Sequence, residues 1–93
     1  MTIDSFQCED TKALFEGRRV PRFANIEKVA MRKLAQLSAA SKLDFLRLPR
    51  GNHLEALKDD RKGQHSIRIN DQWRLCFVWT DGKAHRVEIV DYH

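Results

Sequence analysis

Apolar and polar residues alternate along the second half of the chain, with the two-residue period of strands that bury one face. Four stretches with this pattern predict strands, at 54–58, 64–69, 73–79 and 85–92. Turn-forming residues separate the strands, and connections this short join antiparallel neighbours. The pattern therefore predicts a small antiparallel sheet built as a meander.

The first half of the chain follows the longer period of helices. After a short strand at 3–7, a helix is expected at 10–16, and Gly17 fits the left-handed position that ends helices. A longer helix is expected at 26–40, with Asn25 as its N-cap and apolar residues along one face. The two helices are expected to pack on the sheet.

The apolar side chains also indicate how these parts pack. One face of the sheet can pack on the helices through Ile67, Ile69, Trp73, Leu75, Phe77, Val87 and Ile89. The loop at 41–53 crosses the domain, held down by Leu43, Phe45, Leu46 and Leu48. With 93 residues, the chain is expected to form a single domain over 1–93.

The opposite face of the predicted sheet carries charge. Arg68 and Arg74 lie in the middle of neighbouring strands and share this face with Cys76 and Tyr92. Two guanidinium groups side by side repel each other unless an anion lies between them, and a guanidinium fits a phosphate in a bidentate way. Ion pairing with Glu88, which shares the face, is the alternative explanation.

Positive charge is concentrated in one part of the chain. The net charge is +4, but residues 18–50 contain nine basic residues against two acidic ones, a local charge of +7. Lys28 and Arg32 lie one turn apart on a polar face of the predicted helix. The asymmetry indicates a polyanionic partner, or else a solvated helix face.

Several classes of protein do not fit this composition. No apolar run approaches the roughly 20 residues of a transmembrane helix, and the first residues lack the pattern of a signal peptide. Cys8 and Cys76 lie far apart, and buried cytosolic thiols are expected in preference to a disulfide. Because histidines and cysteines form no ligand-like cluster, neither a metal nor a cofactor is expected. Because a signal peptide and a transmembrane run are both lacking, the protein is expected to be cytoplasmic.

The sequence ends with Asp91-Tyr92-His93, which places a carboxylate, a phenol and an imidazole side by side. They close the last predicted strand, and a strand within a sheet holds its end in place. Each group can exchange a proton or form a hydrogen bond to a phosphate. The alternative is an exposed strand end with ordinary polar residues.

An ordered series of motifs extends from residue 54 to residue 93: Leu54-Glu55-Ala56-Leu57-Lys58, Arg61-Lys62-Gly63, Ser66-Ile67-Arg68-Ile69-Asn70, Gln72-Trp73-Arg74-Leu75-Cys76-Phe77 and Glu88-Ile89-Val90-Asp91-Tyr92-His93. With Ser5-Phe6 and Leu14-Phe15, it resembles the HigB branch of the RelE superfamily, the ribosome-dependent mRNA endonuclease toxins of bacteria. The resemblance implies an α+β, RelE-like fold, with helices on one face of a small antiparallel sheet and messenger RNA on the other. It also implies cleavage in the ribosomal A site without a metal. A HigA-like helix-turn-helix antitoxin would neutralise the toxin, and DNA would be contacted only through that complex.

The resemblance implies six catalytic residues, Glu55, Lys58, Arg74, Asp91, Tyr92 and His93, and four RNA-binding residues, Arg61, Arg68, Lys28 and Arg32. Cleavage without a metal uses the 2′-OH as the nucleophile, so a base must accept its proton and cations must stabilise the charged phosphate. Arg74 and Lys58 suit the cationic role. Tyr92 can stack on a base, and His93 has an ordinary pKa suited to proton transfer. Asp91 can accept a proton or orient a neighbour.

Glu55 departs from the family pattern, in which a histidine commonly occupies its position. A glutamate can accept a proton but brings no positive charge to the phosphate. Glu55 is therefore a base, a structural partner of Lys58 or a spectator. The departure motivates an alternative function, a non-catalytic RNA- or ribosome-binding module on the same scaffold. A repressor that binds DNA directly is disfavoured, because no second short helix follows the helix at 26–40.

Overall fold

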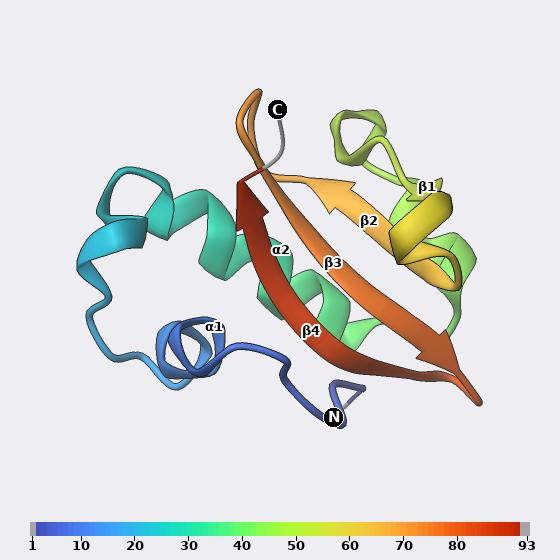
Figure 1. The fold of residues 1–93 in the computed structure, drawn as a ribbon, viewed down its shortest axis with the longest axis horizontal. Helices are drawn as coiled ribbons and strands as arrows, with labels where there is room; N and C mark the ends of the chain where they lie inside the picture. Colours follow the sequence, from blue (N-terminus) through green and yellow to red (C-terminus); the bar gives the residue numbers. More distant parts are fainter. Residues whose placement is uncertain (1, 92–93) are drawn as a thin grey trace.

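The computed structural model describes residues 2–91, and Tyr92 and His93 lie outside the described residues. Two helices and four strands form an α+β fold (Figure 1), with the bounds α1 Glu9–Phe15, α2 Glu27–Ala39, β1 Glu55–Ala56, β2 Gln64–Arg68, β3 Trp73–Thr80 and β4 Lys83–Asp91. Short 3₁₀ turns connect them, at Pro21–Ile26, Leu43–Arg47, Arg50–Asn52 and Asp59–Arg61. No helix among the described residues is long and apolar enough to cross a bilayer.

The four strands form one antiparallel sheet in the order β1-β2-β3-β4, which confirms the predicted meander. Its register places Arg68 opposite Arg74 and Leu75 opposite Ile89. The strand expected at 3–7 is wrong, since this segment makes only two isolated parallel bridges beside β4 among the described residues. Its backbone nevertheless covers the edge of β4, where the Val87 N–H donates to the Ser5 carbonyl.

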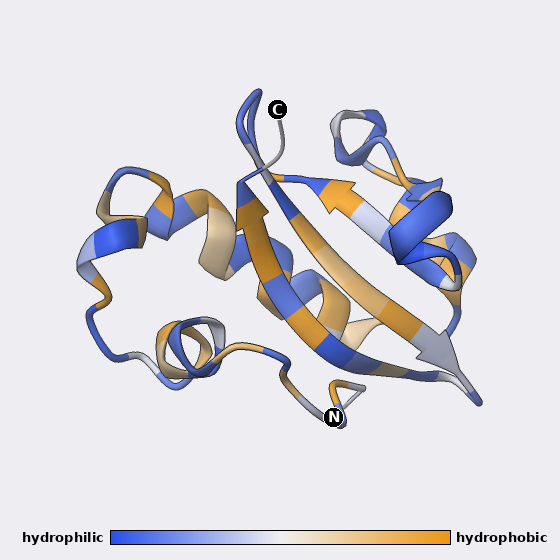
Figure 2. Ribbon diagram, in the orientation of Figure 1, coloured by the Kyte–Doolittle hydropathy of each residue, from blue (hydrophilic) through white to orange (hydrophobic). Residues whose placement is uncertain are grey.

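The core lies between the sheet and the helices, as predicted. Ile67, Leu75, Phe77 and Val87 are fully buried in one cluster with residues of α2. Figure 2 shows the underlying alternation, with hydrophobic and hydrophilic residues following one another along β4. Both helices lie to one side of the sheet in Figure 1, and the other face is not covered by a helix.

The predicted start of the long helix is wrong. Asn25 does not cap it, because Pro21–Ile26 forms a 3₁₀ turn that runs directly into α2, and no side chain caps the helix at Ile26. The end of α1 was predicted correctly. Gly17 has a φ of 88°, and its N–H donates to the Leu14 carbonyl, closing the helix in the way left-handed glycines do.

The loop between α2 and β1 is held differently from the prediction. Leu46 is fully buried and Leu43 packs on the core, but the side chains of Phe45 and Leu48 are exposed. Successive residues of a 3₁₀ turn point about a third of a turn apart, so one turn cannot bury all its apolar side chains. A buried asparagine, Asn52, supplies the remaining anchor through hydrogen bonds.

Candidate active site on the open face of the sheet

The open face of the sheet is the side turned away from the core, defined here by Glu55, Ser66, Arg74, Cys76 and Glu88. The strand register places Glu55 opposite Ser66, Ser66 opposite Cys76, and Cys76 opposite Glu88. Cross-strand partners share a face, so the four residues form one row across the whole sheet. Ser66 and Cys76 are fully buried, and they form a floor beneath the longer charged side chains.

Arg74 is the most firmly held cation on the open face. Its Nε donates to Ser66 Oγ at 2.8 Å, and its Nη2 donates to the His53 carbonyl at 2.7 Å. Glu55 Oε1 lies 3.6 Å from the same Nη2. The Arg74 side chain is only 12% exposed, so these contacts operate away from bulk water. The guanidinium is thus oriented before any ligand binds.

A second ion pair lies further along the row. Arg61 reaches over the face from the 3₁₀ turn after β1, and its Nη1 lies 3.0 Å from Glu88 Oε1 and 3.2 Å from Gln64 Oε1. Glu88 thus pairs with Arg61, in place of the alternative pairing with Arg68 or Arg74 that the sequence left open. The open face carries alternating charge, with two arginines and two glutamates around Cys76.

Cys76 is chemically quiet in this setting. The pKa of its thiol is raised to about 11, mainly by burial; Arg61 and Arg74 lower the pKa, and Glu88 and Glu55 raise it. The thiol therefore stays protonated at neutral pH and acts as an apolar part of the floor. Cys8, which was also expected to be buried, is only partly buried, and both cysteines are free.

Arg68 faces Arg74 across β2 and β3, as the alternation predicted. Each arginine has its own carboxylate nearby, Asp71 for Arg68 and Glu55 for Arg74. Repulsion between the two guanidinium groups is thus offset within the protein, without a bound anion. Arg68 lies in the rim of the face, where Asp71 itself is almost fully exposed.

Glu55 and Lys58 belong to the same recess beside β1. A shallow pocket of about 250 Å³ is lined by both residues and by Ala56, Leu57 and Asp59. Glu55 is fixed by the pairing of β1 with Ser66 in β2, whereas Lys58 is exposed in the segment that follows. Of the six residues expected to be catalytic, Glu55 therefore lies beside Arg74 and shares this pocket with Lys58.

Asp91 takes a different direction from Arg74. It pairs with Trp73 across β3 and β4, and residues 87, 89 and 91 alternate onto the side of the core. Gln72 Nε2 donates to Asp91 Oδ2 at 3.1 Å. Asp91 is thus held at the end of the sheet, as expected, but on the other side of the strand from the open face. Tyr92 and His93 are outside the described residues.

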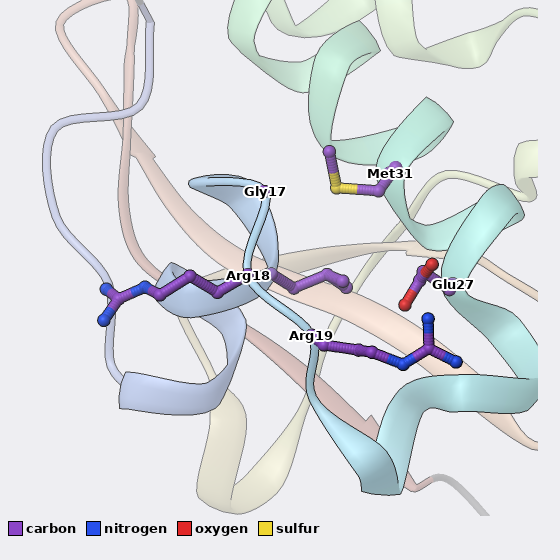
Figure 3. Close-up of a pocket in the computed structure, with 6 residues that line it drawn as sticks. Gly17, Arg18, Arg19, Glu27 and Met31 are labelled. Atoms are coloured by element: carbon purple, nitrogen blue, oxygen red, sulfur yellow. The ribbon is translucent and has the colours of Figure 1, made fainter.

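Lys28 and Arg32 lie far from this arrangement. Both are exposed on α2, which packs against the opposite face of the sheet. A hollow of about 230 Å³ also lies on the helical side, between α1 and α2 (Figure 3). Arg18, Arg19 and Glu27 line it, together with Leu14, Gly17 and Met31. None of the residues expected to be catalytic lines this pocket.

Two groups in the candidate site were missed by the sequence analysis, Ser66 and the backbone carbonyl of His53. Ser66 could have been found, because it is two residues from Arg68 in the same strand and so shares its face. The carbonyl has no signal in the sequence. It is oriented by the left-handed conformation of His53, with φ 44° and ψ 55°, which few residues other than glycine adopt.

Comparison with known proteins shows the family of the chain. Residues 5–93 match the family model described as the RelE-like toxin of the type II toxin–antitoxin system HigB. The chain belongs to the HigB-like family of RelE-like toxins. Its resemblance to the HigB branch, inferred from the motifs between residues 54 and 93, is thereby confirmed.

Individual relatives lie within the same family. A protein of Vibrio cholerae named Toxin HigB-1 is 48% identical over 61 residues, which cover 66% of this chain and 64% of that protein. Endoribonuclease HigB of Proteus vulgaris is 40% identical over 40 residues, covering 43% of this chain and 44% of its own length. The chain thus spans less than two thirds of the length of these HigB-like relatives.

Solved structures show the same fold at low sequence identity. A mutant of Escherichia coli YafQ superimposes with a TM-score of 0.60 at 18% identity, over 96% of this chain and 92% of that one. The YoeB–YefM complex of Staphylococcus aureus gives a TM-score of 0.60 at 20% identity, over 100% and 99% of the two chains. These likenesses confirm the α+β, RelE-like fold of the HigB-like chain.

Proposed function

We propose that this HigB-like chain is the toxin of a toxin–antitoxin pair, a metal-independent endoribonuclease that cleaves mRNA in the ribosomal A site. The observation that carries the proposal is the arginine on the open face. Arg74 is oriented by Ser66 Oγ and the His53 carbonyl, with Glu55 beside it. A pre-oriented guanidinium next to a carboxylate is a suitable arrangement for a phosphodiester whose neighbouring 2′-OH must lose a proton.

The proposed reaction is an internal displacement at phosphorus. The 2′-oxygen attacks, a bond to phosphorus forms, and the bond to the 5′-oxygen breaks, leaving a cyclic phosphate and a 5′-OH. Arg74 and Lys58 stabilise the negative charge that gathers on the phosphate oxygens. Glu55 accepts the 2′-OH proton, and His93 delivers a proton to the leaving oxygen. Asp91 holds the end of the chain in place, and Tyr92 stacks on the flanking base.

RNA binding has to compete with the internal ion pairs. A scissile phosphate at Arg74 would lie beside the Glu55 carboxylate, which already neutralises part of the guanidinium charge. Arg61 and Arg68 are likewise paired, with Glu88 and Asp71. We therefore propose that free mRNA binds weakly and that the ribosome presents the strand to the open face. Lys28 and Arg32 would contact RNA outside this face, on the surface of α2.

The proposed partner is a HigA-like helix-turn-helix antitoxin, through which DNA is contacted indirectly, and the proposed location is the cytoplasm, where translating ribosomes are found. Membership of a toxin–antitoxin family and the structural likeness to YoeB in its complex with YefM support a protein partner. Expression of the chain alone should arrest bacterial growth, and co-expression of the protein encoded next to it should relieve the arrest. Normal growth at high soluble expression would refute the toxin assignment.

A non-catalytic RNA- or ribosome-binding module is the second candidate. It is favoured by Glu55, whose carboxylate pairs with Arg74 where the family commonly has a histidine. A cleavage assay on purified translating ribosomes separates the two functions. The endoribonuclease cuts mRNA on ribosomes and leaves free mRNA intact, whereas a binding module leaves both intact while it lowers the rate of translation.

A further inference from the structure

Asn52 is an unusual residue for its place in the fold. It lies in the surface connection between α2 and β1, yet it is fully buried. Its Oδ1 accepts a hydrogen bond from Lys33 Nζ, and its Nδ2 lies 3.0 Å from the Leu46 carbonyl and 3.3 Å from the Leu48 carbonyl. Gln36 Oε1 lies 3.1 Å from the same nitrogen. One side chain therefore joins the connecting loop to α2.

Lys33 is equally unusual, because its side chain extends into the protein from α2. The residue is 8% exposed, and burial lowers the pKa of its ammonium, with Arg32 and Arg68 adding to the effect. An apolar side chain of the same length would fill this space without the cost of removing a charge from water. Packing alone therefore does not explain a lysine at this position, and the hydrogen bond to Asn52 indicates a further role.

The next residue after Asn52 touches the candidate site. His53 is left-handed, and its N–H donates to the Arg50 carbonyl at 3.1 Å. This conformation directs its own carbonyl to Arg74, whose Nη2 donates to it at 2.7 Å. A single residue therefore separates the buried contacts of Asn52 from the guanidinium on the open face.

We propose that Lys33 and Asn52 are positioning residues. They anchor residues 46–53 to α2, so that the His53 carbonyl holds the Arg74 guanidinium in the direction of the phosphate. The use of Arg74 on a phosphate rests on the proposed function, whereas the orientation of Arg74 does not. Neither Lys33 nor Asn52 touches RNA in this account, and both act through Arg74.

Two substitutions separate positioning from simple stability. Asn52→Ala would remove the buried partner of the Lys33 ammonium and the side-chain donor to the Leu46 carbonyl, so it can unfold the protein. Lys33→Met removes the charge, keeps the length and spares the bonds from Asn52 to the loop. Lys33→Met leaves Asn52 Oδ1 without its ammonium partner but no longer buries a charge, so we expect it to fold and to melt near the temperature of the parent. We expect it to cleave mRNA about 10-fold more slowly, because a small misplacement of a catalytic group is costly.

A matched control and a double-mutant cycle complete the test. Lys12→Met removes the same charge from the exposed surface of α1 and should change neither melting nor cleavage. In an Arg74→Ala background, Lys33→Met should cost nothing more, since its effect passes through Arg74. Full activity in Lys33→Met, an equal loss in both backgrounds, or loss of the fold in Lys33→Met would each overturn the proposal.

A spectroscopic measurement keeps this test independent of the cleavage activity. The Nε–H signal of Arg74 can be followed by ¹⁵N NMR and assigned from its absence in Arg74→Ala. We expect the signal to shift or broaden in Lys33→Met and to stay unchanged in Lys12→Met. An unchanged signal in Lys33→Met would overturn the positioning role. A parent protein that does not cut mRNA on ribosomes would refute the proposed function alone, and the NMR comparison would still decide the orientation of Arg74.

Discussion

The face and the contacts of Arg74 show how far the surroundings of a single residue can be predicted from the sequence. Its face follows from the two-residue period of the strand, so the alternation placed it correctly beside Arg68. Its partners come from β1, β2 and the preceding loop, and they depend on strand register and on the left-handed His53. Local patterns carry no information about such long-range contacts.

The first prediction concerns the two cations of the candidate site. Arg74→Ala should lower the rate of cleavage by about 10²–10³, the usual cost of one transition-state contact. Lys58→Ala should lower it too, by a smaller factor, because Lys58 is more exposed. Thermal melting is the control for the fold. Rates equal to the parent rate in both folded variants would remove these residues from the mechanism.

A pair of substitutions decides whether Glu55 is the base. Glu55→Gln keeps the shape of the side chain but cannot accept a proton, so a base at this position predicts a sharp loss of cleavage. Glu55→His restores the residue common in the family and should keep or raise the rate. If both variants cut mRNA as fast as the parent, Glu55 is a spectator, and His93 becomes the candidate base.

Cys76 predicts a pH dependence of stability. Its thiol has a pKa raised from 9.0 to about 11 in the folded protein, so the unfolded chain ionises first as the pH rises. The contribution of Cys76 to the free energy of unfolding is therefore complete below about pH 9 and falls between about pH 9 and about pH 11. Chemical denaturation should show a shallower fall for Cys76→Ala than for the parent over this interval. Parallel curves would contradict the assignment.

At the scale of elements, the strands of the meander were predicted well and the N-terminal half less well. β2, β3 and β4 follow from alternation and turns, which act over neighbouring residues. Residues 3–7 have an apolar pattern, but their bridges to Ala84 and Val87 depend on a strand about 80 residues away. The 3₁₀ turn before α2 likewise replaced the cap expected at Asn25.

The prediction at the scale of elements concerns the residues that follow the end of β4. The ladder between β3 and β4 extends to Asp91, and the buried residues of the strand, such as Val87 and Ile89, lie before it. Deletion of Tyr92 and His93 should therefore shift the melting temperature by less than about 4 °C, which corresponds to roughly 1 kcal/mol in a domain of this size. The same sample should no longer cleave mRNA on ribosomes. Full activity would exclude the terminal residues from the site, and a large drop in melting temperature would make them structural.

At the scale of the whole molecule, the two faces of the sheet have different roles. One face packs on the helices and supplies the core, and the open face holds Glu55 beside Arg74 over a buried floor, with Lys58 in the pocket next to β1. The resemblance of the motifs predicted the RelE-like fold and the HigB-like family correctly. It did not predict that the arginines of the open face would be paired within the protein, because ion pairing depends on the arrangement of side chains in three dimensions.

The open face is proposed to cut mRNA on the ribosome. This activity is tested most directly by adding the purified protein to ribosomes stalled on two mRNAs whose A-site codons differ in position, and by mapping the ends of the products. We predict that the cut sites move with the A site and that neither mRNA is cut without ribosomes. The rate of cutting should fall by about 10²–10³ in Arg74→Ala. Intact mRNA on the ribosomes, or cuts that ignore the position of the A site, would contradict the account.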